Sequence, residues 1–136
     1  MKIVVDTNVL ISGIFFSGPP ARILRSWCSG DTRFVICPEI MDEYTRVAEI
    51  LKNDYPDIEI DPILTLIFAN SEIAETKPFP FPVCEDPDDD KFLACALCSN
   101  TGILVSGDKH LLKLSGFQGI TIITPRVFVD TYLKHP

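Results

Sequence analysis

The chain has 136 residues, 46% of them apolar and 10% aromatic, with 19 acidic against 12 basic side chains and a net charge of −7. This length suits one domain, expected to span residues 1–136, and the composition excludes a disordered chain. The acidic balance counts against nucleic-acid binding, which depends on Lys and Arg, unless the acids are clustered around a metal ion.

The first part of the chain alternates short apolar runs with helical patterns. Residues 2–6 (KIVVD) predict a buried strand that ends in an acid. A helical stretch follows from about Asn8, is broken at residues 17–20 and resumes over residues 21–28. Residues 33–37 (RFVIC) predict a second strand.

A proline-rich segment divides the middle of the chain. Residues 38–51 predict a helix that opens on a proline, and another helix starts at residue 61. Residues 71–75 predict a short edge strand. Residues 77–82 (KPFPFP) fit neither a helix nor a central strand, so we expect an extended connector. Its two phenylalanines are expected to cover the core, with contact to a substrate base as the alternative.

The last part of the chain again alternates helix and strand. A helix is predicted to run from residue 90 to about residue 100, a strand over residues 103–106 (ILVS) and a helical turn over residues 110–114. A last strand follows at residues 120–123, and Pro125 opens a terminal helix. Short buried strands that alternate with helices indicate an α/β fold, a mostly parallel sheet of about five strands covered on both faces.

Cysteine usage and hydropathy bear on the compartment. Five cysteines are scattered through apolar segments, which favours reduced thiols over disulfides. Cys95 and Cys98 form a C-x-x-C pair, but no second pair or nearby histidine completes a zinc site, so we interpret both as small core residues. No secretory signal and no run of about 18 apolar residues is present. We therefore expect a soluble, cytoplasmic protein.

Two acids follow predicted strands. Asp6 ends the first strand, and Asp108 comes two residues after the strand at residues 103–106. Parallel sheets covered by helices bind ligands beyond the carboxyl ends of their strands. A solvated loop residue remains the simpler interpretation of Asp108 alone. Asp6 adjoins a continuous apolar run, where a carboxylate needs hydrogen bonds or a cation.

Glu43 has an unusual direction in its predicted helix. At 100° per residue it points between Val47 and Ile50, within the apolar arc, whereas Asp42 points to the opposite face. An acid that faces the core near a helix N-terminus is either stabilised by the helix dipole or part of a charged site. We favour the site.

The run at residues 85–90 (EDPDDD) is the densest charge in the chain. One interpretation is a solvated helix N-terminus capped by Asp88. A calcium-binding loop is excluded, because Lys91 stands where glycine is required and Leu97 where glutamate is required.

A third interpretation turns one acid of this run inward. Asp90 shares a helix face with Ala94. Asp89 shares another face with Leu93, so periodicity does not choose between the two acids. Clustered carboxylates repel one another unless a cation lies among them. Ligands that are all oxygen favour Mg²⁺ or Mn²⁺ over zinc, and such a centre activates water for attack on a phosphodiester.

Four segments, in order along essentially the whole chain, resemble the motifs of the PIN-domain nucleases. VVDTNVLIS, which carries Asp6, is similar to the first motif, and CPEIMDEYTRV, which carries Glu43, is similar to the second. DPDDDKFLACAL resembles the third, in which an acid is followed four positions later by a small residue, and this alignment favours Asp90 over Asp89. VSGDKHLL, which carries Asp108, resembles the fourth, with Ser at a position where many members have Thr.

The resemblance implies a three-layer α/β/α fold and Mg²⁺- or Mn²⁺-dependent hydrolysis of RNA. It is strongest to members that act as toxins of toxin–antitoxin pairs, which implies an antitoxin partner and a dimer. On this hypothesis Asp6, Asp90 and Asp108 bind the metal, and Glu43 completes the catalytic set of four acids. The side chains expected to hold the carboxylates by hydrogen bonds are Asn8 and Ser106. The candidates for phosphate binding are Arg22, Arg25, Arg46, Lys91 and Lys109.

Two other functions are weighed against the nuclease. A receiver or aspartate-nucleophile phosphatase also uses an acid at the end of the first strand. The phosphatase pattern needs a second acid where this chain has Asn8, and the receiver needs paired acids where it has Val5. A non-catalytic interaction module with the same fold and metal is the remaining alternative.

Overall fold

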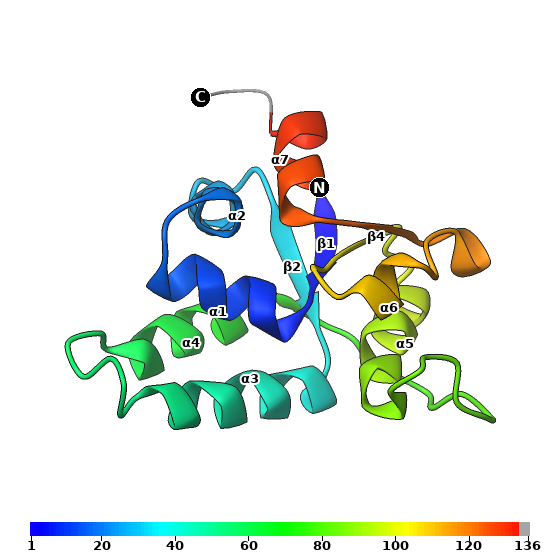
Figure 1. Cartoon of the computed structure of the whole chain (residues 1–136), viewed down its shortest axis with the longest axis horizontal. Coiled ribbons are helices and arrows are strands. Elements are labelled where there is room, and N and C mark those ends of the chain that lie inside the picture. The colour runs from blue at the N-terminus through cyan, green and yellow to red at the C-terminus, as the bar shows by residue number, and fades with distance from the viewer. Residues whose placement is uncertain (134–136) are drawn as a thin grey trace.

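The computed structural model describes residues 1–133 and is built around one sheet of five parallel strands (Figure 1). Residues 134–136 of the predicted domain lie outside the described residues. The strands are β1 (Lys2–Val5), β2 (Arg33–Ile36), β3 (Glu72–Ile73), β4 (Ile103–Val105) and β5 (Thr121–Ile123). They lie in the order β3-β2-β1-β4-β5, and every pair is parallel. The predicted α/β fold with about five strands is confirmed.

The central strands are buried, as their apolar runs predict. Val4 of β1 pairs with Leu104 of β4, and Val5 pairs with Val105. All four side chains are at most 2% exposed. Continuous apolar strands of this kind are typical of a parallel sheet covered on both faces.

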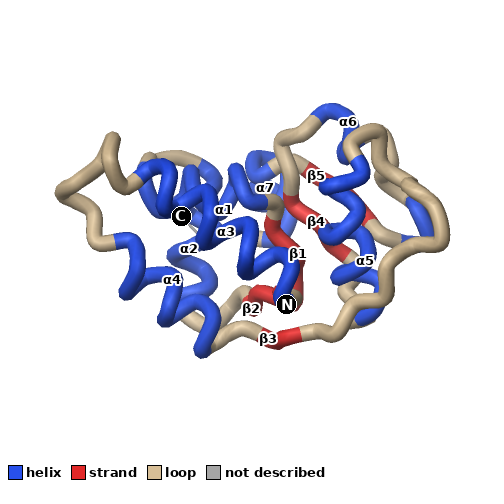
Figure 2. The backbone as a smooth tube through the Cα atoms, turned by 90° about the horizontal axis from the view of Figure 1, so that it is seen from below, coloured by secondary structure: helices blue, strands red, loops and turns tan. Residues whose placement is uncertain are grey.

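Helices form the two outer layers. In Figure 2, α1 to α4 and α7 gather on one side of the strands, and α5 and α6 lie on the other. Right-handed crossovers require α1 to α4 and α5 to α6 to lie on opposite faces, because the chain moves from β1 to β3 in one direction and then from β3 to β5 in the other. The helix α7 follows the last strand and belongs to no crossover. The helices are α1 (Thr7–Phe15), α2 (Pro19–Cys28), α3 (Pro38–Leu51), α4 (Ile60–Ala69), α5 (Asp90–Cys98), α6 (Lys109–Leu112) and α7 (Pro125–Tyr132).

Buried aromatic contacts hold two of these helices against the sheet. Tyr44 of α3 is 1% exposed, and its hydroxyl donates a hydrogen bond to the backbone carbonyl of Val5. Trp27 of α2 stacks on Phe34 of β2 with ring centroids 5.7 Å apart. The anchoring of Tyr44 brings the preceding residue, Glu43, to the end of β1.

The cysteines and the helix lengths test two further expectations. All five cysteines are free. Cys95 is buried, as expected, but Cys98 is exposed, because α5 ends there and turns toward solvent. Among the helices of residues 1–133, none has the length and apolar character needed to cross a membrane.

The carboxyl ends of β1 and β4 meet where the strand order reverses. From β1 the chain continues to β2 on one side, while β4 and β5 lie on the other. The backbone N–H of Asp6 donates to the carbonyl of Val105 at 2.9 Å. Parallel sheets bind ligands at such a switch point.

Candidate active site at the carboxyl edge of the sheet

Asp6 is a buried carboxylate at the end of β1. Its side chain accepts a hydrogen bond from the hydroxyl of Ser106 at 2.7 Å, and the residue is 7% exposed. Burial raises its pKa, and the charges of Glu43 and Asp108 add to this effect. Hydrogen bonds from Ser106 and the backbone of Thr7 act in the opposite direction without offsetting burial. The charged form of Asp6 would therefore gain from a nearby cation.

Ser106 joins Asp6 to Asp108. The backbone N–H of Asp108 donates to the Ser106 hydroxyl oxygen at 3.0 Å. The Asp108 carboxylate accepts the N–H of His110 at 2.8 Å and so caps α6. Ser106, which is fully buried, thus fixes the position of Asp6 at the end of β1 relative to Asp108, which precedes α6.

Glu43 has a partner for each carboxylate oxygen. The hydroxyl of Thr7 donates to Oε2, and Nζ of Lys91 lies 2.8 Å from Oε1. The side chains of Glu43 and Lys91 are 12% and 14% exposed. Arg46 lies 3.8 Å from Oε1, at the longer end of an ion pair. Glu43 is therefore fixed beside the first turn of α1, and its charge is balanced by Lys91.

Asp90 points away from these acids. Its two oxygens accept the backbone N–H groups of Val83 and Cys84 at 3.0 and 2.7 Å. Partial burial raises its pKa, but the hydrogen bonds from these two residues outweigh burial, and the net pKa is lowered. Asp90 therefore anchors the end of the connector. This arrangement differs from the expectation that its side chain meets Asp6, Glu43 and Asp108.

Asp89 is the acid of this run that interacts with the cluster. Its pKa is raised to about 7, first by burial and then by the charges of Asp6 and Asp108, with smaller effects of Asp86 and Glu43. The sequence could not single it out, because α5 is buried from Phe92 to Ala96 and lacks the polar face on which periodicity relies. We refer to Asp6, Asp89 and Asp108 as the acid cluster.

A cavity of about 390 Å³ opens beside the acid cluster. Asp6 and Asp108 line it, together with Asn8 of α1 and the prolines that begin α2 and α7, Pro20 and Pro125. Although the sequence suggests that Asn8 holds the carboxylates, its side chain makes no hydrogen bond to a carboxylate within residues 1–133. Ser106 instead donates to the carboxylate of Asp6 and accepts the backbone N–H of Asp108.

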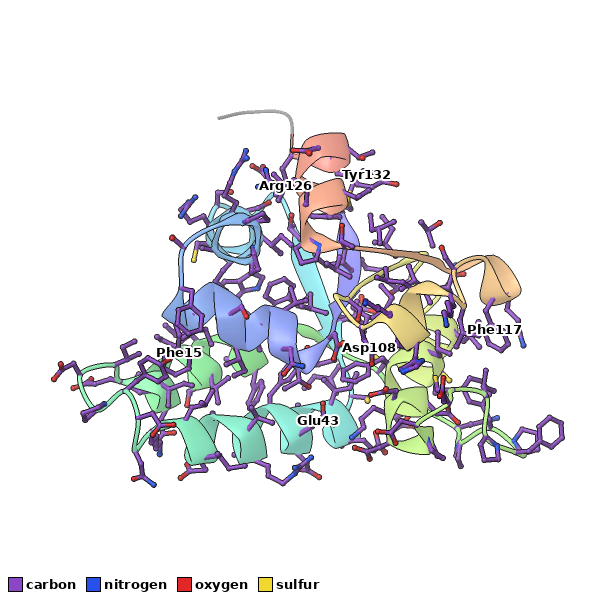
Figure 3. All side chains as sticks on the ribbon, viewed as in Figure 1. Phe15, Glu43, Asp108, Phe117, Arg126 and Tyr132 are labelled. Atoms are coloured by element: carbon purple, nitrogen blue, oxygen red, sulfur yellow. The ribbon has the colours of Figure 1, made fainter. Side chains whose placement is uncertain are left out.

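The predicted phosphate-binding residues fall into two groups. Arg46 and Lys91 are paired with Glu43, and Lys91 also pairs with Asp88 at 3.2 Å. Arg22 and Arg25 lie on α2, and Lys109 is exposed directly after Asp108. Figure 3 labels Glu43 on α3 and Asp108 directly before α6.

The chemistry of the acid cluster suits Mg²⁺ or Mn²⁺, since its side-chain ligands are all carboxylate oxygens. Within residues 1–133, however, no three His, Cys, Asp or Glu side chains lie close enough together to hold one ion. Carboxylates that repel one another are expected to stand apart without a cation. Mg²⁺ also keeps several waters and needs only one or two carboxylates, so these residues fit such an ion.

The chain is similar to proteins with a PIN domain. Residues 2–110 match the PIN domain family profile, a span that contains the acid cluster and Glu43 and ends within α6. The chain is also similar to the uncharacterized protein MJ1680 of Methanocaldococcus jannaschii. The two are 29% identical over 150 aligned residues, which cover 98% of this chain and 93% of the relative.

Proposed function

Because the chain belongs to the PIN-domain family, whose members are generally nucleases, we propose that it is a divalent-metal-dependent endoribonuclease that hydrolyses RNA phosphodiester bonds at the acid cluster. The observation that carries this proposal is the pair of hydrogen bonds by which Ser106 holds the carboxylate of Asp6 and the backbone of Asp108 at one edge of the sheet. Burial and mutual repulsion raise the pKa of Asp6 and of Asp89, and Asp108 contributes to the repulsion at both. A hard divalent cation offsets such repulsion.

Each residue has a distinct part in this proposal. Asp6, Asp89 and Asp108 would hold Mg²⁺ or Mn²⁺, directly or through the waters that such an ion keeps. When bound, the ion supplies Lewis acidity to the scissile phosphate and lowers the pKa of the attacking water. Ser106 orients Asp6 and Asp108 through its hydroxyl.

Glu43 is better suited to orienting water than to binding the ion directly. Thr7 and Lys91 already occupy its two oxygens. Each carboxylate oxygen has a second lone pair, which leaves room for one more hydrogen bond. The predicted toxin role, the antitoxin partner, the dimer and the cytoplasmic location stay predictions.

Cleavage of a labelled single-stranded RNA by the purified protein, with Mg²⁺, with Mn²⁺ or with excess chelator, tests the proposal. We expect metal-dependent cleavage that Asp6→Asn lowers by at least about 100-fold, since groups that merely support metal ligands contribute about 10–100-fold. Asp57→Asn is the matched control, because Asp57 is exposed and has no ion pair or hydrogen bond within residues 1–133. Equal cleavage by Asp6→Asn, or cleavage in chelator, would indicate a contaminant and overturn the proposal.

A further inference from the structure

Charge is distributed unevenly over this acidic chain. Residues 7–30 and 120–133, which include α1, α2 and α7, contain three arginines and one acid, a net charge of +2. The chain as a whole carries −7, so the remaining residues are strongly acidic. The three arginines are Arg22, Arg25 and Arg126, which we call the arginine face.

The arginine face begins at the cavity beside the acid cluster. The helices α2 and α7 pack against each other, and the prolines at their starts, Pro20 and Pro125, both line that cavity. Arg126 directly follows Pro125, and Arg22 comes two residues after Pro20. Arg25 lies almost one helical turn farther along α2. Figure 3 shows Arg126 beside α7, on the side toward α2.

Within residues 1–133, two of these arginines lack acidic partners. Arg25 and Arg126 are exposed and form no ion pair with any residue from 1 to 133. On the other side of the acid cluster, Lys91 is already paired with Glu43 and Asp88. A guanidinium binds phosphate through two parallel hydrogen bonds and is more weakly hydrated than an ammonium group. A polyanion that approaches the acid cluster is therefore attracted over α2 and α7 and repelled from the acidic α3 and α5 side.

We propose that the backbone of a single-stranded RNA lies across the arginine face, from Arg25 past Arg22 to Arg126, and enters the cavity at Asp6 and Asp108. This inference rests on the proposed function, since RNA is the substrate of that reaction. It adds the direction from which the strand reaches the acid cluster and names the side chains that neutralise its phosphates.

Salt dependence of binding tests the strand path. A labelled single-stranded RNA is titrated with protein in chelator at several KCl concentrations, and binding is followed by fluorescence anisotropy. For single strands the slope of log K against log salt falls by about 0.7 for each phosphate that the protein no longer neutralises, which corresponds to a roughly five-fold weaker binding at about 0.1 M salt. We expect this change for Arg25→Gln and for Arg126→Gln, and twice the slope change for the double variant.

Arg33→Gln is the matched control. Arg33 is exposed, has no ion pair within the described part of the chain, and lies at the start of β2, at the opposite edge of the sheet. Its slope should equal that of the wild type. An equal fall for Arg33→Gln would show that only net charge matters. The proposal would be overturned by that result, by unchanged slopes for Arg25→Gln and Arg126→Gln, or by the absence of wild-type binding at low salt.

The two proposals fail separately. Binding with the expected slopes but no cleavage in Mg²⁺ or Mn²⁺ would overturn the nuclease and leave the strand path standing. Metal-dependent cleavage with unchanged slopes in the arginine variants would do the reverse. Melting curves of each variant check that folding is intact, since surface substitutions of this kind usually leave stability almost unchanged.

Discussion

Two adjacent carboxylates at the start of α5 have opposite surroundings. Asp90 accepts two backbone hydrogen bonds from the end of the connector, and its pKa is lowered. Asp89 is partly buried near Asp6 and Asp108, and its pKa is raised to about 7. The fold stabilises the charge of Asp90 but destabilises the charge of Asp89. One acid therefore maintains the structure, while its neighbour is available to a cation.

If Asp89 is the acid that is available to a cation, its substitution should have the largest effect on cleavage. We expect Asp89→Asn to lower RNA cleavage by at least about 100-fold, by the same reasoning as for Asp6. Its melting temperature in chelator should not fall, because the substitution removes a charge that repels Asp6 and Asp108. Single-turnover cleavage at saturating Mg²⁺ and thermal melting measure the two effects. Wild-type cleavage by Asp89→Asn would remove this residue from the site.

The periodicity of the sequence could not decide between Asp89 and Asp90, whereas other features were predictable. Apolar runs were sufficient to predict the parallel sheet and an edge strand over residues 71–75, within which β3 covers Glu72–Ile73. The prolines of residues 77–82 were sufficient to predict the connector. Local patterns specify these features. The position of Asp6 after a buried strand and the direction of Glu43 on α3 were visible for the same reason. The structure places Asp6 in the acid cluster and Glu43 beside it.

Local patterns of this kind could not predict contacts between distant segments. The hydrogen bonds of Asp90 go to Val83 and Cys84 in a loop without periodicity. The partner of Glu43, Lys91, lies 48 residues away in sequence. Both contacts depend on how the connector returns the chain to α5, which no local pattern in the chain describes.

Because the hydrogen bonds of Asp90 maintain the structure, its substitution is expected to lower the stability of the protein. Asn at this position keeps one acceptor oxygen, so one of the two backbone N–H groups of Val83 and Cys84 loses its partner. We expect Asp90→Asn to lower the free energy of unfolding by about 1.5–3 kcal/mol, the usual contribution of a hydrogen bond to a charged group. Urea denaturation measures this change. Cleavage by the folded protein should be retained, and abolished cleavage with unchanged stability would instead place Asp90 in the metal site.

A smaller effect on cleavage is expected from substitution of Ser106, the neutral side chain that supports the acid cluster. Ser106→Ala removes the hydroxyl that donates to Asp6 and accepts from the backbone of Asp108. We expect the Mg²⁺ concentration for half-maximal cleavage to rise about tenfold, at the lower end of the range for groups that orient metal ligands. Ser106→Thr keeps the hydroxyl and is the control. If both variants behave alike, the hydroxyl has no part in holding the acid cluster.

The smallest effect is on the pH dependence of stability, where the two carboxylates act in opposite directions. Asp89 has an ordinary pKa of 3.8 and a folded pKa of about 7, so the unfolded chain releases its proton first. The metal-free protein should therefore lose stability as the pH rises from about 4 to about 7. Solvent screening at this partly exposed residue keeps the loss small.

Asp90, with its lowered pKa, adds stability that is present above pH 3.8 and lost as the pH falls below it. Urea denaturation in chelator at several pH values measures both slopes. Asp89→Asn should reduce only the slope above pH 4, and the part caused by the raised pKa of Asp6 should remain. Because a cation must displace the proton of Asp89, added Mg²⁺ should raise the melting temperature more at pH 8 than at pH 5. If Asp89→Asn leaves the slope above pH 4 unchanged, the repulsion that distinguishes Asp89 from Asp90 does not act on folding.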